Sequence, residues 1–214
     1  MAKFVFCGDI HGKVEQVRRA LDMEGNIIFV GDFIDSFDRT VMEHDECFRL
    51  VIDAIEKKKA RAIYGNHELS YLMPDPHLAS GWDKYRAAVV QKYESKIRQL
   101  FEPYIILTPE FLVTHAGLTN QLWKERNLLA ELLPEMLKEW WEDKLSPAHW
   151  IGRYRGGYNP YGGIFWCDFN QEFEEIPELT QIFGHTPGKG IRQLGKSFCI
   201  DCLDRESSFL ELEI

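Results

Sequence analysis

Residues 3–12 read KFVFCGDIHG, a short β-rich run that passes directly into Gly-Asp and then His and Gly. Residues 27–35 read IIFVGDFID and again end an apolar run in Gly-Asp. Between the two runs, Val14, Val17 and Leu21 recur at the spacing of one helical face. Strand, helix and strand in this order predict a βαβ unit at the start of the chain.

The rest of the chain continues to alternate between helical and strand patterns. A helical face formed by Phe48, Val51 and Ile55 precedes a third strand predicted at 61–64. Further predictions are a helical segment at 69–102, strands at 104–107 and 111–114, a long helix at 121–145 interrupted near Pro134, a Gly-rich loop at 146–163, and strands at 181–183, 197–200 and 208–214. With no repeat or linker, we expect a single domain over 1–214, with cap-like helical segments at about 69–102 and 121–163.

Composition excludes several classes of partner. The 214 residues carry a net charge of −9, so a general basic surface for nucleic acid or anionic membrane is not expected. No stretch approaches the roughly 18 apolar residues of a membrane helix, and the N-terminus lacks the long apolar run of a secretory signal. The five cysteines are scattered and odd in number, which favours a reduced, cytoplasmic protein. We expect a monomer without a membrane partner.

Five short motifs stand at the ends of predicted strands and carry the residues with the most chemistry. They are GDIHG at 8–12, GDFID at 31–35, GNHE at 65–68, THAG at 114–117 and GHT at 184–186. A single Gly-Asp is usually a turn and a single His is usually structural, but five such motifs in order are hard to explain as turns. The carboxyl ends of strands are where open α/β sheets bind ligands, and mixed carboxylates and imidazoles suit Mn, Fe, Zn or Mg.

In this order the five motifs resemble the calcineurin-like metallophosphoesterases, whose pattern is GDxHG, GDxxD, GNHE, a His beside Gly, and GHT. The spacing, the GHTP at 184–187 and the FWCD at 165–168 look most like the lambda-type branch of the protein serine/threonine phosphatases. The resemblance implies an α/β fold of two mixed β-sheets packed as a sandwich and flanked by helices. It also implies a metal-dependent phosphatase.

The resemblance further implies a ligand set for two divalent metal ions, with Mn²⁺ as first choice and Fe, Zn, Ni or Mg as alternatives. Asp32 would bridge the two ions and so hold them about 3.5–4 Å apart, and a hydroxide bound to the metals would attack a phosphomonoester. The remaining ligands would be Asp9 and His11 at the first metal, and Asn66, His115 and His185 at the second.

Proton transfer and further substrate contacts are implied by the same resemblance. His67 would protonate the leaving oxygen, and Asp35 would accept a hydrogen bond from the other ring nitrogen of His67. Asn66 would also contact the substrate, and Glu68 would support the site from behind. A helix cap or turn carboxylate is the alternative interpretation of Asp35.

Two positions depart from the protein phosphatase pattern. Ser36 stands where those enzymes carry a phosphate-gripping Arg, and Tyr64 stands where lambda-type enzymes tend to carry another. Arg39, three residues after Ser36, is the first choice as replacement, and Arg153 and Arg155 in the Gly-rich loop are the alternatives. Each of the three can also be read as an ordinary solvated arginine.

Three functions stay open on the sequence. The leading prediction is a phosphomonoesterase acting on phosphoproteins or small phosphate esters. The first rival is a nucleotide phosphoesterase, either a diadenosine polyphosphate hydrolase or a 2′,3′-cyclic phosphodiesterase. The second rival is a binding or scaffold protein that kept the fold and lost the metals, which is disfavoured because every type of ligand is present.

Overall fold

The computed structural model describes residues 1–73, 79–126, 130–203 and 208–214. These residues divide into two compact units, which are described separately. Unit 1 comprises Met1–Glu102 and Cys202–Ile214, and unit 2 comprises Pro103–Asp201. The single domain expected from the sequence remains a prediction.

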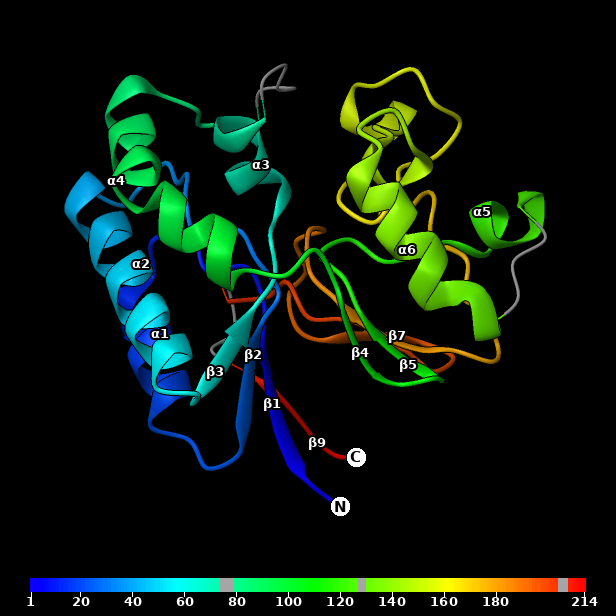
Figure 1. Cartoon of the computed structure of the whole chain (residues 1–214), viewed down its shortest axis with the longest axis horizontal. Coiled ribbons are helices and arrows are strands. Elements are labelled where there is room, and N and C mark those ends of the chain that lie inside the picture. The colour runs from blue at the N-terminus through cyan, green and yellow to red at the C-terminus, as the bar shows by residue number, and fades with distance from the viewer. Residues whose placement is uncertain (74–78, 127–129, 204–207) are drawn as a thin grey trace. The chain divides into compact units, whose positions relative to one another are not determined.

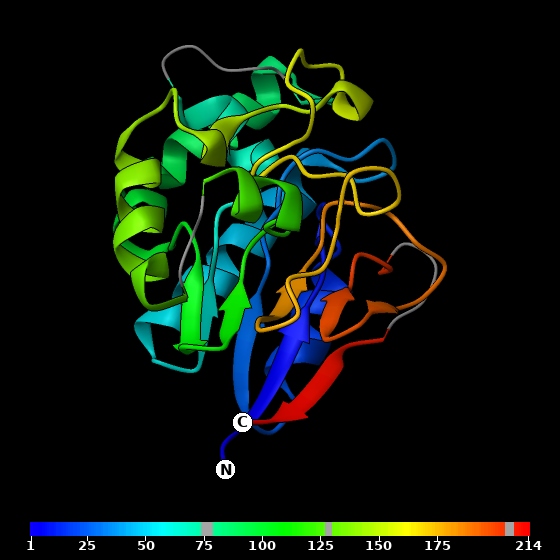
Figure 2. The ribbon, with the colours of Figure 1, turned by 90° about the vertical axis from the view of Figure 1, so that its right-hand side faces the viewer.

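A four-stranded mixed sheet forms the centre of unit 1, with strand order β3-β2-β1-β9. Its strands are β1 (Lys3–Cys7), β2 (Asn26–Phe29), β3 (Ala60–Ala62) and β9 (Leu210–Glu213). The first three are parallel, whereas β9 runs antiparallel to β1 and pairs Phe4 with Leu212. The two chain ends therefore lie side by side, as Figures 1 and 2 show, and the Ala2 N–H donates to the Ile214 carbonyl.

Four helices complete unit 1: α1 (Val14–Leu21), α2 (Val41–Glu56), α3 (Asn66–Leu72) and α4 (Lys84–Leu100). Helices α1, α2 and α4 lie together on one side of the unit (Figure 1). Helix α2 begins at a reciprocal cap, in which the Thr40 hydroxyl accepts from the Glu43 N–H and the Glu43 carboxylate accepts from the Thr40 N–H. Asp83 caps the N-terminus of α4, because its carboxylate accepts two N–H groups of the first turn.

Phe33 anchors the loop after β2 in the core of unit 1. Its ring is fully buried and lies 5.3 Å from the ring of Phe101, 5.8 Å from that of Phe29 and 5.9 Å from that of Phe48. These partners come from three separate elements or their ends, so the loop cannot move without opening the aromatic core. Asp32 and Asp35, which lie in the same loop as Phe33, are therefore held in place.

Unit 2 contains a five-stranded mixed sheet with strand order β4-β5-β6-β8-β7. The strands are β4 (Ile105–Thr108), β5 (Phe111–Val113), β6 (Thr180–Phe183), β7 (Arg192–Leu194) and β8 (Ser197–Cys199). Strands β5, β6 and β8 are parallel, and β4 and β7 close the edges as antiparallel hairpin partners. Figure 2 shows β4 and β5 in green and the other strands in orange.

Helical segments in unit 2 are short. They are α5 (Asn120–Glu125), α6 (Leu133–Glu142) and 3-10 turns at Ala130–Leu132, Pro147–His149 and Arg153–Arg155. The long helix predicted at 121–145 is therefore replaced by separate elements, and Pro134 lies in the first turn of α6. Proline fits there because the N–H that it lacks would have no helical partner in that turn.

The predicted fold class is confirmed: the chain forms two mixed sheets flanked by helices. Strand β7 was not predicted, because its three residues are half-buried or exposed and show no apolar pattern. None of the helices in the described ranges combines the length and the hydrophobicity needed to cross a membrane.

Gly31→Ala is expected to disrupt the contact between the ends of β2 and β3. Gly31 has φ +103°, and a Cβ there would lie 2.5 Å from the backbone nitrogen of Gly65. Gly156 supplies a matched control, because it has φ +82° but nothing within 4 Å of an added Cβ. Left-handed backbone costs a non-glycine residue about 1–2 kcal/mol at both sites, and the clash adds to that cost only at Gly31.

Urea denaturation followed by circular dichroism measures both effects. Gly156→Ala should lower the free energy of unfolding by about 1 kcal/mol, and Gly31→Ala by about 3 kcal/mol or more. Equal losses would contradict the close approach of the two strand ends.

Candidate functional site

Each of the five motifs follows a strand, as the sequence predicts. In unit 1 the motifs at 8–12, 31–35 and 65–68 follow β1, β2 and β3, and in unit 2 those at 114–117 and 184–186 follow β5 and β6. Because the strands concerned are parallel within each sheet, their carboxyl ends share one edge. Each unit therefore gathers its own motif residues at one edge of its sheet.

The backbone is strained at four of the predicted site residues. Positive φ angles occur at His11 (44°), Asp32 (53°), Asp35 (64°) and His185 (69°). Such angles are uncommon outside glycine and cluster at functional sites, where surrounding contacts hold them. The motifs are thus bent to present particular side chains.

Glu68 joins the strained loop after β2 to the loop after β3. Its fully buried carboxylate accepts N–H groups from Asp32 (2.9 Å), Phe33 (2.7 Å), Ile34 (3.2 Å) and Gly65 (2.9 Å). Burial and the charge of Asp32 raise the pKa of Glu68 to about 7, whereas the four donors favour its ionised form. The loops after β2 and β3 are held against one another through this single side chain.

The ring of His11 is held in one tautomer. Its Nδ1 lies 2.6 Å from the Asp35 carbonyl and 3.0 Å from the Ile34 carbonyl. Carbonyls only accept, so Nδ1 carries the proton and Nε2 presents its lone pair. Burial, together with the neighbouring His67, lowers the pKa of His11 to about 4, which keeps the ring neutral. This is the form in which histidine binds metals.

Asp32 presents one carboxylate oxygen toward two imidazoles. Its Oδ2 lies 3.8 Å from Nε2 of His11 and 3.9 Å from Nε2 of His67, while Oδ1 accepts the backbone N–H of His67 at 3.0 Å. These three side chains can offer ligand atoms within 4.8 Å of one another. Gly65 permits the approach, because a Cβ there would lie 2.0 Å from Oδ1. The arrangement fits a divalent cation of the kind that prefers mixed oxygen and nitrogen ligands.

Asp9 and Asn66, the other unit-1 ligands implied by the resemblance, are both buried. Asp9 directly follows Gly8 at the end of β1, and Asn66 is the first residue of α3. The backbone carbonyl of Asn66 accepts the Ser70 hydroxyl at 2.9 Å, which fixes the first turn of the helix. Their assignment as ligands remains a prediction.

His67 and Asp35 form a largely buried hydrogen-bonded pair. His67 Nδ1 donates to Asp35 Oδ2 at 2.8 Å, which leaves Nε2 as the nitrogen able to exchange a proton. Burial by itself would lower the pKa of His67, but the carboxylates of Asp32 and Asp35 outweigh it and raise the pKa above its usual value. The pair was predicted from the sequence, and its geometry suits proton donation.

In unit 2, His115 and His185 face one another. Nε2 of His115 lies 3.2 Å from Nδ1 of His185, and the rings meet edge to face with centroids 5.0 Å apart. The Gly184 N–H donates to the His115 carbonyl at 2.7 Å and fixes the relative position of the two backbones. Two imidazole nitrogens this close can bind the same cation.

The three candidate arginines differ in their surroundings. Arg39 forms ion pairs with Glu15 of α1 (2.9 Å) and Glu43 of α2 (3.3 Å). Arg153 is exposed. Arg155 pairs with Asp168 at 3.0 Å, and its Nη2 also contacts the His185 carbonyl (3.3 Å) and the Thr186 hydroxyl (2.8 Å). Within the described part of the chain, the Arg155 guanidinium thus donates hydrogen bonds to two residues of the motif at 184–186, whereas Arg39 pairs with carboxylates of α1 and α2.

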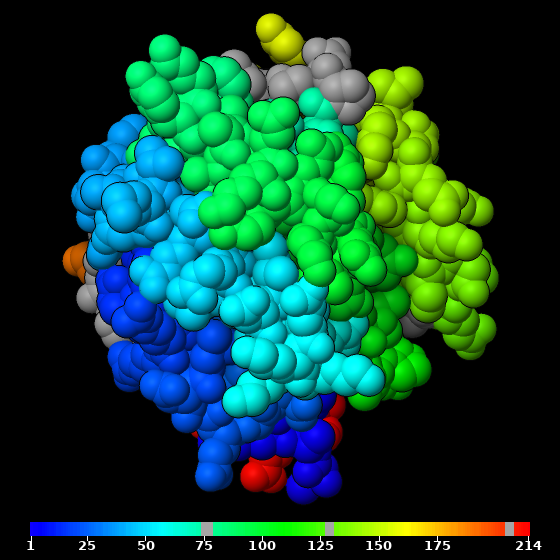
Figure 3. Space-filling view, turned by 60° about the vertical axis from the view of Figure 1, so that its left-hand side comes forward, coloured from blue at the N-terminus to red at the C-terminus, as the bar shows by residue number. Residues whose placement is uncertain are grey.

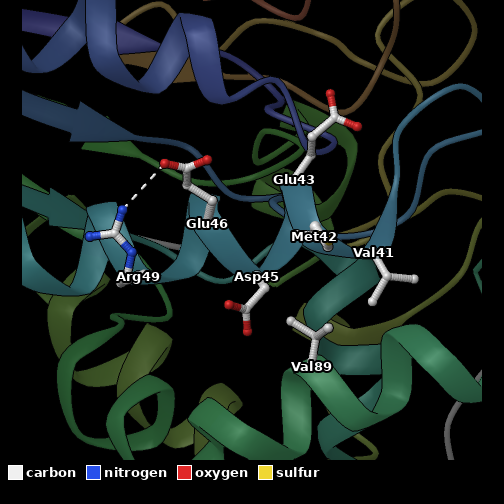
Figure 4. Close-up of a pocket in the computed structure, with 7 residues that line it drawn as sticks. All are labelled: Val41, Met42, Glu43, Asp45, Glu46, Arg49 and Val89. Atoms are coloured by element: carbon white, nitrogen blue, oxygen red, sulfur yellow. Dashed lines mark hydrogen bonds and ion pairs between the residues drawn. The ribbon is translucent and has the colours of Figure 1, made fainter.

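A surface hollow of about 440 Å³ in unit 1 is separate from these residues. Figure 3 shows the face on which α2 and α4 lie side by side, and Figure 4 shows the hollow between them. It is lined by Val41, Met42, Glu43, Asp45, Glu46, Arg49 and Val89. Because none of the predicted site residues lines it, the hollow is not the candidate site.

Two residues of unit 1 that sequence reasoning missed contact the site. The Tyr71 hydroxyl donates to Asp35 Oδ1 at 2.5 Å, and burial together with this bond raises the pKa of Tyr71. Arg86 donates to the carbonyls of Gly81 and Ser36, which lie far apart in sequence. Tyr71 stands one helical turn after His67, and that spacing was the available signal for Tyr71. No local sequence pattern indicates the contacts of Arg86.

Most of the chain matches the model of one protein family. The model of the calcineurin-like phosphoesterases matches residues 2–189, which include all five motifs. None of the curated proteins matches the sequence.

One solved structure shares the fold, and a second shows a weaker similarity. A cold-active protein tyrosine phosphatase is 17% identical, with a TM-score of 0.65 over 100% of this chain and 74% of that chain. A protein serine/threonine phosphatase from Saccharomyces cerevisiae, similar to human phosphatase PP5, is 16% identical, with a TM-score of 0.49 over 93% of this chain and 66% of that chain. At 17% identity the likeness to the first structure concerns the fold alone.

Glu68→Gln is expected to destabilise unit 1 strongly. Glutamine keeps the shape but replaces one acceptor oxygen by an NH₂ group, which leaves buried N–H groups without an acceptor. Charge-assisted hydrogen bonds contribute about 1.5–3 kcal/mol each, so we expect a loss of about 3 kcal/mol or more in the free energy of unfolding.

Glu94→Gln is the control. Glu94 forms an i,i+4 ion pair with Arg98, and the side chains of both residues are about half exposed. Exposed helix pairs contribute about 0.3–0.5 kcal/mol, so the control should be nearly silent. Both variants are measured by urea denaturation of the metal-free protein. Similar losses in the two would show that Glu68 does not hold the loops together.

Proposed function

Because the chain belongs to the calcineurin-like phosphoesterase family, and is therefore a metal-dependent phosphoric ester hydrolase, we propose that it hydrolyses phosphomonoesters with two divalent metal ions. The observation that carries the proposal is the His67–Asp35 pair. It presents Nε2 of His67 as a proton donor 3.9 Å from Asp32 Oδ2, on the side of the predicted bridging ligand.

The proposed metal ligands are those that the family resemblance implies. They are Asp9, His11, Asp32 and Asn66 of unit 1 with His115 and His185 of unit 2. Support comes from the fixed tautomer of His11, from Oδ2 of Asp32, which faces the Nε2 atoms of His11 and His67, and from the close nitrogens of His115 and His185. Mixed oxygen and imidazole donors make Mn²⁺ the first choice, with Fe, Zn, Ni or Mg as alternatives.

When bound, the two ions would activate a water molecule as nucleophile and stabilise charge on the phosphoryl oxygens. Residues of the chain would then protonate the leaving group. His67 donates the proton from Nε2 to the departing oxygen, and Asp35 stabilises the charged imidazole and holds its orientation. Asn66 precedes His67 directly and is proposed to contact the substrate as well.

Arg155 is the preferred phosphate clamp. Arg39 is committed to two carboxylates that join α1 and α2, and this favours a structural role for it. Arg155 already lies against the carbonyl of His185, and its guanidinium can offer a second edge to a phosphate. Ser36 replaces the arginine expected in the protein phosphatase pattern, so a clamp from the Gly-rich loop would take over its task.

Phosphoproteins and small phosphomonoesters are the proposed substrates, in line with the lambda-type protein phosphatase resemblance. The nucleotide phosphoesterase alternative rests on the departures at Ser36 and Tyr64. Hydrolysis of a phosphopeptide, an alkyl phosphate, diadenosine tetraphosphate and 2′,3′-cyclic AMP, each with Mn, Zn, Fe, Ni and Mg, separates these reactions. Activity confined to the nucleotides would overturn the monoesterase proposal.

Asp32→Asn is expected to abolish hydrolysis and to reduce bound metal. The substitution keeps the shape but removes the charge that would neutralise two closely spaced cations. Metal analysis of the purified variant and the ester assay measure the two effects. Asp45→Asn is the control, because Asp45 lies on α2 and pairs with Lys92 at the surface. Full activity with two metals bound to Asp32→Asn would contradict the ligand assignment.

Arg155→Ala is expected to lower kcat/KM on a phosphomonoester by about tenfold or more, whereas Arg39→Ala lowers stability with little effect on kcat/KM. Arg155→Lys retains the charge but not the planar fork and should recover only part of the loss. Ser36→Arg in the Arg155→Ala background should restore part of the activity by returning an arginine to the family's position. A larger loss in Arg39→Ala than in Arg155→Ala would reverse the assignment.

A further inference from the structure

The carboxylate of Asp35 is held at both oxygens. Oδ2 accepts from Nδ1 of His67 at 2.8 Å, and Oδ1 accepts from the Tyr71 hydroxyl at 2.5 Å. The Asp35 side chain is almost completely buried, so the tyrosine hydroxyl takes a place that water would otherwise fill. The plane of the carboxylate is thereby fixed, and with it the ring of His67.

The direction of the Tyr71 hydrogen bond follows from its second partner. The backbone N–H of Asp83 lies 3.3 Å from the same phenolic oxygen. A backbone N–H only donates, so the tyrosine oxygen accepts there and directs its own proton to Asp35. The hydroxyl cannot exchange these roles without losing one of the two bonds.

Residues of the segment 79–86 hold Tyr71 and Asp35 from the outside. The Trp82 ring stacks on the Tyr71 ring at 5.8 Å with an interplanar angle of 18°. Gly81 has φ +90°, and a Cβ there would lie 3.2 Å from Cβ of Asp35. Arg86 fastens this segment to the loop after Asp35 through its bonds to the carbonyls of Gly81 and Ser36. Trp82, Gly81 and Arg86 therefore restrict the positions of Tyr71 and Asp35 together.

We propose that Tyr71 is a positioning residue for proton donation, acting through Asp35 on His67. The inference rests on the proposed function, in which His67 protonates the leaving oxygen. With its Oδ1 partner removed, the Asp35 carboxylate can rotate and the imidazole loses its fixed direction. Turnover should therefore fall only for substrates whose leaving group needs a proton.

Tyr71→Phe tests the proposal by removing a single hydroxyl. On an alkyl phosphate, kcat should fall about tenfold, the effect of losing one well-placed hydrogen bond, whereas on an aryl phosphate with a stable phenolate it should change less than about twofold. Tyr64→Phe is the matched control, because the Tyr64 hydroxyl is buried and donates to the Ile97 carbonyl at 3.2 Å. The control should not distinguish the two esters.

A double substitution shows whether Tyr71 acts through His67. His67→Asn should lower turnover on the alkyl ester by roughly 10²–10⁴, the usual contribution of a general acid. Adding Tyr71→Phe to His67→Asn should then cost nothing further. Additive losses, or equal losses on alkyl and aryl esters in Tyr71→Phe alone, would overturn the proposal and leave Tyr71 with a merely structural role.

Nuclear magnetic resonance of ¹⁵N-histidine-labelled protein with Mg²⁺ provides a readout that needs no turnover. In the wild type the His67 Nδ1–H proton should be slow to exchange with water, and in Tyr71→Phe it should exchange faster. An unchanged signal would refute the positioning role. If the wild type hydrolyses none of the esters, the proposed function fails, and this measurement still decides the role of Tyr71.

Discussion

A buried carboxylate, Glu68, is the constraint on which the unit-1 site depends. It accepts four backbone N–H groups, three from the loop after β2 and one from Gly65 after β3. An ionised group in the interior is stable only when such donors surround it, so the side chain and the two loops define one another. Gly31 and Gly65 allow the contact, because neither backbone could come as close with a Cβ.

The loop fixed by Glu68 orients two imidazoles. The carbonyls of Ile34 and Asp35 hold His11 with its Nδ1 protonated, as the proposed metal ligand requires, while the Asp35 side chain orients the ring of His67, the proposed proton donor. One strained residue, Asp35, therefore serves both rings, through its backbone for one and its carboxylate for the other. In unit 2 a backbone hydrogen bond likewise positions two imidazoles. The Gly184 N–H donates to the His115 carbonyl, and the rings of His115 and His185 face one another.

Much of this was predictable because the motif residues are local. The five motifs and their place after strands follow from short runs of sequence, in which glycine marks a close approach and the polar residue follows the strand. The His67–Asp35 pair, whose members lie 32 residues apart, was instead implied by the resemblance to the family. The contacts of Arg39 and Arg155 were not predictable. Both arginines stand near a motif, but the partners that distinguish them, Glu15 and Asp168, lie 24 and 13 residues away in sequence.

The sequence by itself determined the family and the mixed α/β architecture, and it predicted which residues bind metal or transfer a proton, because these depend on residue type and order. The tertiary structure alone decided the tautomer of His11, the second bond to Asp35 from Tyr71 and the support of that bond by Trp82 and Arg86. Hydrogen-bond direction and ring orientation change when the distance between two segments that are far apart in sequence changes by a few tenths of an ångström. Only folding of the backbone sets those distances.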